Sequence, residues 1–182
     1  MHLAVVPTVD DPDGELWGLY CRAFDDLRTR AVQRHLMVRA EFDALMADPR
    51  VDKFIAISEA RTVVGLATMT NDLAAVPLIS PEFFAHRWPD LYDRRRVWYV
   101  GFVAVDPVHQ AAGVMGRIID RMGTEVDVTV GGVICVDISE QRELAQRLPT
   151  VIEAQARRSA PGITRVRLDA QVYWGYEFPT PA

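Results

Sequence analysis

"VWYVGFVAVDPVHQAAGVMGRIIDRMG", residues 97–123, is the stretch that decides the fold of this chain. Residues 97–105 are apolar on both alternating faces, which is typical of a central strand covered on both sides. Residues 111–122 follow an Asp-Pro pair and repeat apolar side chains at three- and four-residue spacing, which predicts an amphipathic helix ending at Gly123. The chain therefore passes from a buried strand into a helix through one short turn.

That turn is built from Gln110, Ala111, Ala112 and Gly113. Glycine disfavours a helix by about 1 kcal/mol relative to alanine, so Gly113 needs a reason. One reason is a helix N-terminus kept free of bulk, where unpaired N–H groups and the positive end of the helix dipole hold a phosphate. The other is close packing of the helix on the sheet, with no ligand. The sequence leaves both explanations open.

The flanking segments predict a mixed sheet. A second apolar strand at 131–139 follows the helix, and strand, helix and strand within about 40 residues imply a right-handed crossover and a parallel pair. Two apolar runs at 52–60 and 62–70 predict an antiparallel hairpin. The other expected elements are a strand at 2–9, a helix at 16–27, a helix at 39–49, a helix at 140–158 that Pro149 kinks or splits, and one long or two short strands at 164–178.

The composition of the 182-residue chain indicates one globular domain spanning residues 1–182. Hydrophobic residues make up 49% and charged residues 25%, which is typical of a folded protein in water. The formal net charge of −5 argues against nucleic acid or an anionic membrane as a partner and favours a small molecule. Two cysteines outside any paired motif, with no leader or membrane-spanning run, predict a cytoplasmic protein.

Residues 71–96 form a long connection that fits neither a long helix nor a strand, because three prolines interrupt it. Long connections in compact domains are often functional, so one interpretation is a lid or a partner surface. The alternative is an ordered excursion that packs Phe83, Phe84 and Trp88 on the core.

In its order of elements the chain resembles the GNAT superfamily of acyl-CoA-dependent N-acetyltransferases. The signature of that family is Gln or Arg, two residues, Gly, one residue, then Gly or Ala, and this chain has Gln110, Gly113 and Met115 at those places. Met115 departs from the pattern, and Gly116 comes one position late. The resemblance implies a single-domain, GNAT-like α/β (α+β) fold. Its sheet would be mixed and mostly antiparallel, with a central splayed parallel strand pair and flanking helices.

The resemblance also implies that acetyl-CoA or another acyl-CoA is the cosubstrate. Its pyrophosphate would lie at the turn and its pantetheine arm beside the central strand. Gly101 would mark a bulge where the two parallel strands part to admit the thioester. No metal is expected, since Asp106 and His109 have no third ligand in reach. The candidate cofactor-binding residues are Val103, Ala104, Val105, Gln110, Ala111, Ala112, Gly113, Val114, Met115 and Gly116.

The catalytic residues are less well defined. Many members of the family place a Glu six residues before the strand-end Val, and the count back from Val105 gives Tyr99, whose alternative role is in the core. Asp137, expected to be buried on its strand, and Glu59, near the hairpin turn, are alternative bases. Ser139 lies at the expected mouth between the parallel strands and is equally well explained as a helix N-cap. The candidate catalytic residues are therefore Tyr99, Asp137, Ser139 and Glu59.

The resemblance implies an enzyme, an acyl-CoA-dependent N-acyltransferase that moves an acetyl or short acyl group to an amine by direct attack. The acceptor would be an amine of a small molecule, peptide or protein. Two alternatives are a non-catalytic acyl-CoA-binding sensor or accessory domain, and acyl transfer from an acyl carrier protein. Because the C-terminal stretch has no strong turn signal for a hairpin, its strand is expected to run long or to pair with another subunit in a homodimer.

Overall fold

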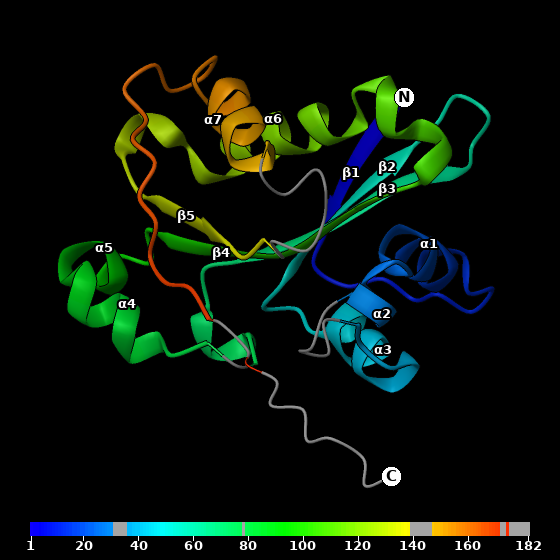
Figure 1. Ribbon diagram of the computed structural model, residues 1–182, viewed down its shortest axis with the longest axis horizontal. Helices are drawn as coiled ribbons and strands as arrows, with labels where there is room; N and C mark the ends of the chain where they lie inside the picture. The colour runs from blue at the N-terminus through cyan, green and yellow to red at the C-terminus, as the bar shows by residue number, and fades with distance from the viewer. Residues whose placement is uncertain (31–35, 78, 139–146, 172–173, 175–182) are drawn as a thin grey trace, which may run out of the picture.

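The computed structural model describes residues 1–30, 36–77, 79–138, 147–171 and 174. Within these ranges the chain forms one five-stranded sheet with helices on both faces (Figure 1). None of the described helices has both the length and the apolar character that crossing a membrane requires. In chain order the elements are β1 (His2–Val6), α1 (Glu15–Phe24), α2 (Leu27–Arg30), α3 (Arg39–Ala47), β2 (Asp52–Ile57), β3 (Val63–Thr70), η1 (Leu73–Ala75), α4 (Pro81–Arg87), α5 (Pro89–Asp93), β4 (Val97–Val105), η2 (Pro107–Ala112), α6 (Val114–Val126), η3 (Val128–Val130), β5 (Val133–Val136) and α7 (Leu148–Ala156).

The sheet is mixed and mostly antiparallel, with strand order β1-β2-β3-β4-β5. Antiparallel pairing joins β1 to β2, β2 to β3 and β3 to β4, which confirms the predicted hairpin at 52–70. β4 and β5 pair in parallel, with Val97 opposite Val133 and Val100 opposite Val136. α6 lies in the connection between these two strands. The predicted fold class, including its one parallel pair, is therefore confirmed.

One face of the sheet is covered by α6, with α7 packed beside it (Figure 1). The buried side chains of α6 recur every four residues and pack in one cluster with Trp98 and Val100 of β4. The predicted helix end at Gly123 is wrong, because α6 continues to Val126. Val126 is 2% exposed, so the last turn adds an apolar contact that offsets the cost of a helical glycine. The buried residues of α6 are Val114, Ile118, Met122 and Val126.

The opposite face carries two separate groups of helices (Figure 1). α1 and α3 pack at one end through an aromatic cluster, in which the ring of Tyr20 lies 5.4 Å from that of Phe42 and 5.1 Å from that of Phe102. α4 and α5 cover the other end, where Phe84 packs with Val97, Cys135 and the half-buried Tyr99. β4 therefore passes from one helix group to the other, with Tyr99 in the second group and Phe102 in the first.

The connection at 71–96 is an ordered excursion that contains η1, α4 and α5. Phe84 is buried and Trp88 packs against its cluster, whereas Phe83 is 40% exposed. The ordered-excursion interpretation is therefore confirmed for Phe84 and Trp88 and wrong for Phe83. Pro81 and Pro89 begin the two short helices, because the N–H that proline lacks would be unpaired in a first turn anyway.

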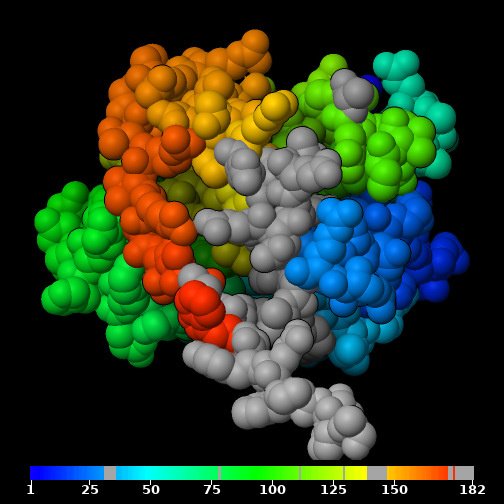
Figure 2. All heavy atoms as spheres, in the orientation of Figure 1, coloured from blue at the N-terminus to red at the C-terminus, as the bar shows by residue number. Residues whose placement is uncertain are grey.

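The C-terminal region differs from the sequence prediction. α7 begins at Leu148, so Pro149 lies in its first turn, and residues 140–146 of the predicted helix lie outside the described residues. The strand predicted over 164–178 is absent from 164–171, which pass down one side of the molecule without joining the sheet (Figure 2). This stretch buries little apolar surface, since Leu168 packs against the α4–α5 cluster but Val166 is exposed. Residues 172–173 and 175–178 lie outside the described residues.

Lys53 is the only lysine of the chain, and it is fully buried. Its Nζ donates to the carbonyl oxygens of Pro7 at 2.7 Å, Asp48 at 2.6 Å and Val51 at 2.7 Å. Burial lowers the pKa of Lys53, and the charges of Asp48 and Asp52 act in the opposite direction. One ammonium group thus joins the chain after β1, the end of α3 and the start of β2.

Replacing Lys53 by methionine should lower the free energy of unfolding by about 3 kcal/mol, because three carbonyl groups lose their donor in a buried place. Urea denaturation measures this change. Arg28→Met is the matched control, since Arg28 is exposed and pairs, among the described residues, with exposed Asp25, and its effect should stay within about 0.5 kcal/mol. A Lys53→Met loss as small as that of the control would contradict the anchoring role.

Candidate functional site

The edge of β4 opens partway along its length. The parallel pairing with β5 ends where Val100 lies opposite Val136, but β4 continues to Val105. The antiparallel register on the other side shifts at the same place, because Thr68 lies opposite Phe102 while the next residue of β3 lies opposite Val100. Gly101 is therefore the extra residue of a β-bulge, as the sequence predicted.

The open part of β4 presents backbone groups to a ligand. The N–H of Asp106 donates to the carbonyl oxygen of Val64 at 3.0 Å, which fixes the alternation of hydrogen bonds between β3 and β4. By that alternation Ala104 bonds to β3, and Val103 and Val105 turn their N–H and C=O groups to the opposite side. Among the described residues no strand pairs with that side beyond Val100. An extended ligand can therefore bind there as an added strand.

The turn after β4 connects this open edge to the N-terminus of a helix. η2 fills residues 107–112, so the predicted helix start at 111 is wrong, and α6 begins only at Val114. Gly113 precedes α6 in the left-handed conformation, with φ 70° and ψ 15°, and no side chain caps the helix. A Cβ at Gly113 would meet nothing within 4 Å, which shows that close packing on the sheet is the wrong explanation for this glycine. Glycine is favoured at this position because the backbone has a positive φ, and the position borders open space.

The predicted cofactor-binding residues lie along this path. Val103, Ala104 and Val105 form the open end of β4, and Gln110, Ala111 and Ala112 lie in η2, with Gln110 and Ala112 exposed. Val114 is buried in the core and offers only its backbone, and Met115 is half-buried. Gly116 lies under Gln155 of α7, whose side chain would be 3.5 Å from a Cβ at this position.

Asp106 holds the turn in place. Its carboxylate accepts the backbone N–H of Val108 at 3.0 Å and the guanidinium of Arg22 at 3.0 Å, and His109 Nδ1 lies 3.9 Å from the same carboxylate. Burial acts to raise the pKa of Asp106, but the bonds from Val108 and Arg22 outweigh it and hold that pKa below its usual value. Arg22 belongs to α1, so this contact ties a helix of one sheet face to the turn that enters α6 on the other.

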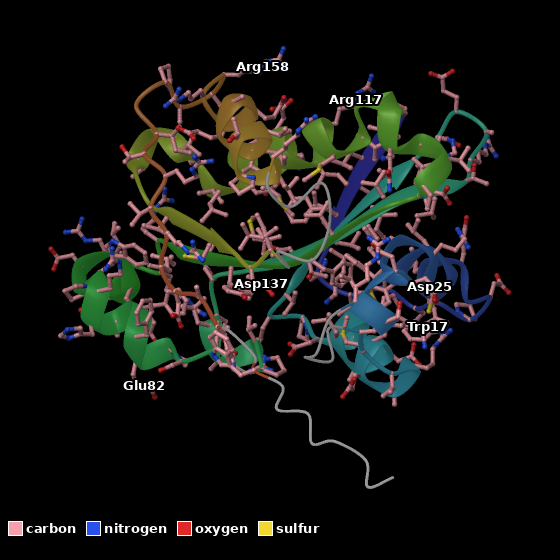
Figure 3. The ribbon with its side chains drawn as sticks, in the orientation of Figure 1. Trp17, Asp25, Glu82, Arg117, Asp137 and Arg158 are labelled. Atoms are coloured by element: carbon pink, nitrogen blue, oxygen red, sulfur yellow. The ribbon has the colours of Figure 1, made fainter. Side chains whose placement is uncertain are left out.

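Two of the four predicted catalytic residues come together. Tyr99 of β4 lies opposite Cys135 of β5, and its phenol donates a hydrogen bond to Asp137, the first residue after β5. Burial, followed by the charge of Asp137 and this hydrogen bond, raises the pKa of Tyr99 above its usual value. Asp137 is exposed, so the expectation that it is buried is wrong; its strand ends at Val136. Figure 3 shows Asp137 near the middle of the molecule, between the two helix groups.

The other two candidates are not brought to this pair. Glu59 lies in the turn between β2 and β3, at the end of the sheet that is remote from Tyr99, and its side chain is 95% exposed beside the amino group of Met1. Ser139 lies outside the described residues. Of the four candidates, Tyr99 and Asp137 are therefore the two that lie near the end of the β4–β5 pairing.

Thr68 is a polar residue of this region that sequence reasoning missed. Of the three polar side chains buried in the described parts of the chain, Lys53 is satisfied by its carbonyls. Thr70 Oγ1 donates to the carbonyl oxygen of Arg50 at 2.6 Å and accepts the N–H of Asp72 at 2.9 Å. Thr68 Oγ1 has no hydrogen-bond partner among the described residues, at a cost of about 1–3 kcal/mol. Nothing in the sequence distinguishes Thr68 from Thr70.

Two surface hollows lie at the other end of β4, away from α6. Their volumes are about 480 and 150 Å³, and both include Asp72 and Arg95. The arginines of the larger hollow are already paired, Arg50 with Asp48 and Arg95 with Asp72. The described part of the chain has no cluster of His, Cys, Asp and Glu that could hold a metal ion. The features that fit a ligand are therefore those of the β4 edge and α6.

The sequence matches no protein-family model and no curated protein, but the fold matches solved acetyltransferases. An aminoglycoside acetyltransferase from an uncultured soil metagenomic sample is 12% identical, with a TM-score of 0.55 over 96% of this chain and 97% of that chain. Aminoglycoside 6'-N-acetyltransferase AAC(6')-Ih from Acinetobacter baumannii is 9% identical, with a TM-score of 0.51 over 98% and 100%. AAC(6')-Iy, solved in complex with CoA, is 11% identical, with a TM-score of 0.50 over 97% and 99%. The chain therefore has the GNAT fold, as the resemblance implied.

Replacing Asp106 by alanine should lower the free energy of unfolding by about 1–2 kcal/mol at pH 7, because the cap of η2 and the bond to Arg22 are lost. The folded-state pKa of Asp106 is below its unfolded value, so this contribution is present above the unfolded pKa and is lost as the pH falls through the folded pKa. The difference between the two proteins should therefore shrink below about pH 4.

Urea denaturation at pH 7 and pH 3 measures this difference. Asp13→Ala is the control, because Asp13 is exposed, and this variant should match the unsubstituted protein at both pH values. An Asp106→Ala loss that is equal at the two pH values would show that the carboxylate charge contributes nothing.

Proposed function

We propose that this protein is an N-acyltransferase that moves an acetyl or short acyl group from acyl-CoA to an amine. The observation that carries the proposal is the continuity of two open features. The edge of β4 from Gly101 to Val105, with which no described strand pairs, leads through η2 to the uncapped N-terminus of α6. A ligand suited to both has an extended amide-bearing arm joined to an anionic group, and acyl-CoA has that composition. A solved protein with this fold is bound to CoA.

The helix terminus suits the pyrophosphate of CoA. The first backbone N–H groups of α6, at Val114, Met115 and Gly116, have no side-chain cap and lie beside the open space of Gly113. A pyrophosphate placed there accepts these N–H groups and lies at the positive end of the helix dipole. The amides of the pantetheine arm then pair with the outward N–H and C=O groups of Val103 and Val105. This places the thioester next to Gly101, where β4 and β5 part.

The acyl group passes by direct attack of the amine. The amine nitrogen bonds to the thioester carbonyl carbon, the C–S bond breaks, and the products are an amide and CoA. Asp137 takes the proton that the nitrogen loses, directly or through one water, and the thiolate of CoA takes a proton from water. Tyr99 holds the Asp137 carboxylate, and its raised pKa keeps the phenol protonated as a donor. Burial raises the pKa of the neighbouring Cys135 to about 11, which disfavours a cysteine-bound acyl intermediate.

The acceptor would be an amine of a small molecule or peptide. The sheet face beneath α6 is filled by the packing of Trp98 and Val100, so the amine would approach from the opposite face, between the two helix groups (Figure 3). Asp137 lies there. We assign no nucleic acid, membrane or metal to this reaction, and an expected cytoplasmic location and a homodimer remain predictions.

Acetyl-CoA binding tests the proposal. At a concentration 100 times its Kd, acetyl-CoA should add about 2.7 kcal/mol to the free energy of unfolding and raise the melting temperature. Gly113→Val should abolish this shift because its side chain fills the open space, while its positive φ costs about 1–2 kcal/mol of stability. Gly162→Val is the control, because a Cβ there also meets nothing within 4 Å, far from α6 in sequence. If millimolar acetyl-CoA produces no shift in the unsubstituted protein, the cofactor assignment is wrong.

Release of CoA thiol with a panel of amines tests the catalysis. Asp137→Asn should lower kcat by about 100-fold or more, because the base is lost. Tyr99→Phe should lower it less, since it removes only the group that orients the carboxylate. Asp25→Asn, an exposed change just after α1, should leave kcat unchanged (Figure 3). Acetyl-CoA binding without thiol release from any amine would favour the non-catalytic sensor, and release only from an acyl carrier protein would favour that donor.

A further inference from the structure

The hydroxyl of Thr68 is directed at the β-bulge of β4. A Cβ built on Gly101 would lie 2.7 Å from Thr68 Oγ1 and 3.9 Å from Thr68 Cβ, with no other atom of comparable proximity. Gly101 does not have a positive φ, so the backbone conformation does not require glycine. The requirement is space, and the atom that borders this space is the Thr68 oxygen.

This space lies on the sheet face opposite α6. Ala67 and Met69, the neighbours of Thr68, belong to the cluster under α6, so Thr68 projects to the opposite face by strand alternation. On that face Phe102 packs with the α1 group and Tyr99 with the α4 group. Gly101 is exposed between them. Thr68 Oγ1 thus lies beside exposed Gly101, where the proposed function places the acyl group and the amine.

The other two polar residues that are buried as a whole in the described parts of the chain, Thr70 and Lys53, have hydrogen-bond partners. Two buried nitrogens also lack a hydrogen-bond partner, His109 Nδ1 and Arg121 Nε, but both side chains face a carboxylate, of Asp106 and of Glu125. A buried hydroxyl that is left without a partner in an apolar sheet calls for a bound group. A valine would fill the same volume without an unsatisfied oxygen. The hydroxyl carries a donor hydrogen, and at the reacting centre of acyl-CoA the acceptor is the thioester carbonyl oxygen.

We propose that Thr68 is a catalytic residue whose hydroxyl donates to the thioester carbonyl oxygen beside Gly101. As the amine nitrogen bonds to the carbonyl carbon, the π electrons of the C=O bond move to this oxygen, and the hydroxyl stabilises the charge that develops there. When the oxyanion re-forms the carbonyl, the C–S bond breaks. This assignment rests on the proposed function, because it needs a bound acyl-CoA.

The test uses the full chain with acetyl-CoA labelled with carbon-13 at its carbonyl. Relative to free acetyl-CoA, the infrared carbonyl stretch of the bound ligand should lie at lower frequency in the unsubstituted protein and in Thr68→Ser. In Thr68→Val this shift should be absent. Thr68→Val should fold with equal or greater stability, because it removes an unsatisfied hydroxyl. Its kcat should fall about 100-fold with the KM for acetyl-CoA nearly unchanged.

Thr70→Val is the matched control, since it removes a satisfied hydroxyl from the same strand. It should lower stability and leave the carbonyl frequency unshifted relative to the unsubstituted protein. Gly101→Ala gives a second approach, because its Cβ enters the space beside Thr68 Oγ1 and should remove the frequency shift while Thr68 remains.

The outcomes separate this proposal from the preceding one. If acetyl-CoA does not bind the unsubstituted protein, the proposed function is wrong and the role of Thr68 falls with it. If acetyl-CoA binds and its carbonyl frequency is the same in the unsubstituted protein and in Thr68→Val, only the role of Thr68 is wrong. A Thr68→Val change that raises the KM for the amine, with kcat and the frequency unaltered, also overturns it.

Discussion

The structure depends on how far β4 is paired. A central strand satisfies its backbone on both sides, yet among the described residues β4 does so only as far as Val100, and its last five residues pair there with β3 alone. Backbone N–H and C=O groups left open in this way need water or a ligand as partners. The crossover from β4 to β5 starts at this open end, so the turn and the N-terminus of α6 are necessarily next to it. Two kinds of donor, strand and helix, are thereby brought to one edge of the sheet without any dedicated side chain.

The two faces of the sheet differ in how they are covered. The face under α6 is a continuous apolar cluster, which holds the helix whose N-terminus points to the open edge. The other face is covered at both ends, by α1 and α3 and by α4 and α5, and the polar groups Thr68, Tyr99 and Asp137 lie along the stretch between. The hydrogen bond from Arg22 to Asp106 joins the two faces, because Arg22 belongs to α1 on one face and Asp106 begins the turn that leads into α6 on the other. A displacement of α1 would therefore be transmitted to the turn through the guanidinium group of Arg22.

Much of this arrangement could be predicted from the sequence. The apolar run at 97–105, the glycine within it and the small residues after it specify the strand, the bulge and the helix entry, because each depends on local pattern. The end of α6 could not be predicted, since the burial of Val126 depends on tertiary packing. The irregular course of 164–171 also escaped prediction, because strand propensity does not show that Leu168 packs on the α4–α5 cluster while Val166 stays exposed. Thr68 carries no local signal, and its interest comes from an unsatisfied oxygen seen only in three dimensions.

The single lysine has a chemical consequence. Thioesters acylate exposed amines slowly without any enzyme, and lysine side chains are the usual targets on a protein surface. In this chain every other basic side chain besides histidine is arginine, whose guanidinium stays protonated and is a poor nucleophile. Lys53 itself is fully buried, with its ammonium group held by three carbonyl oxygens. The lysine side chain is thus kept out of reach of acyl donors. A protein that binds thioesters and has its only lysine buried would not lose surface charge through acylation of lysine.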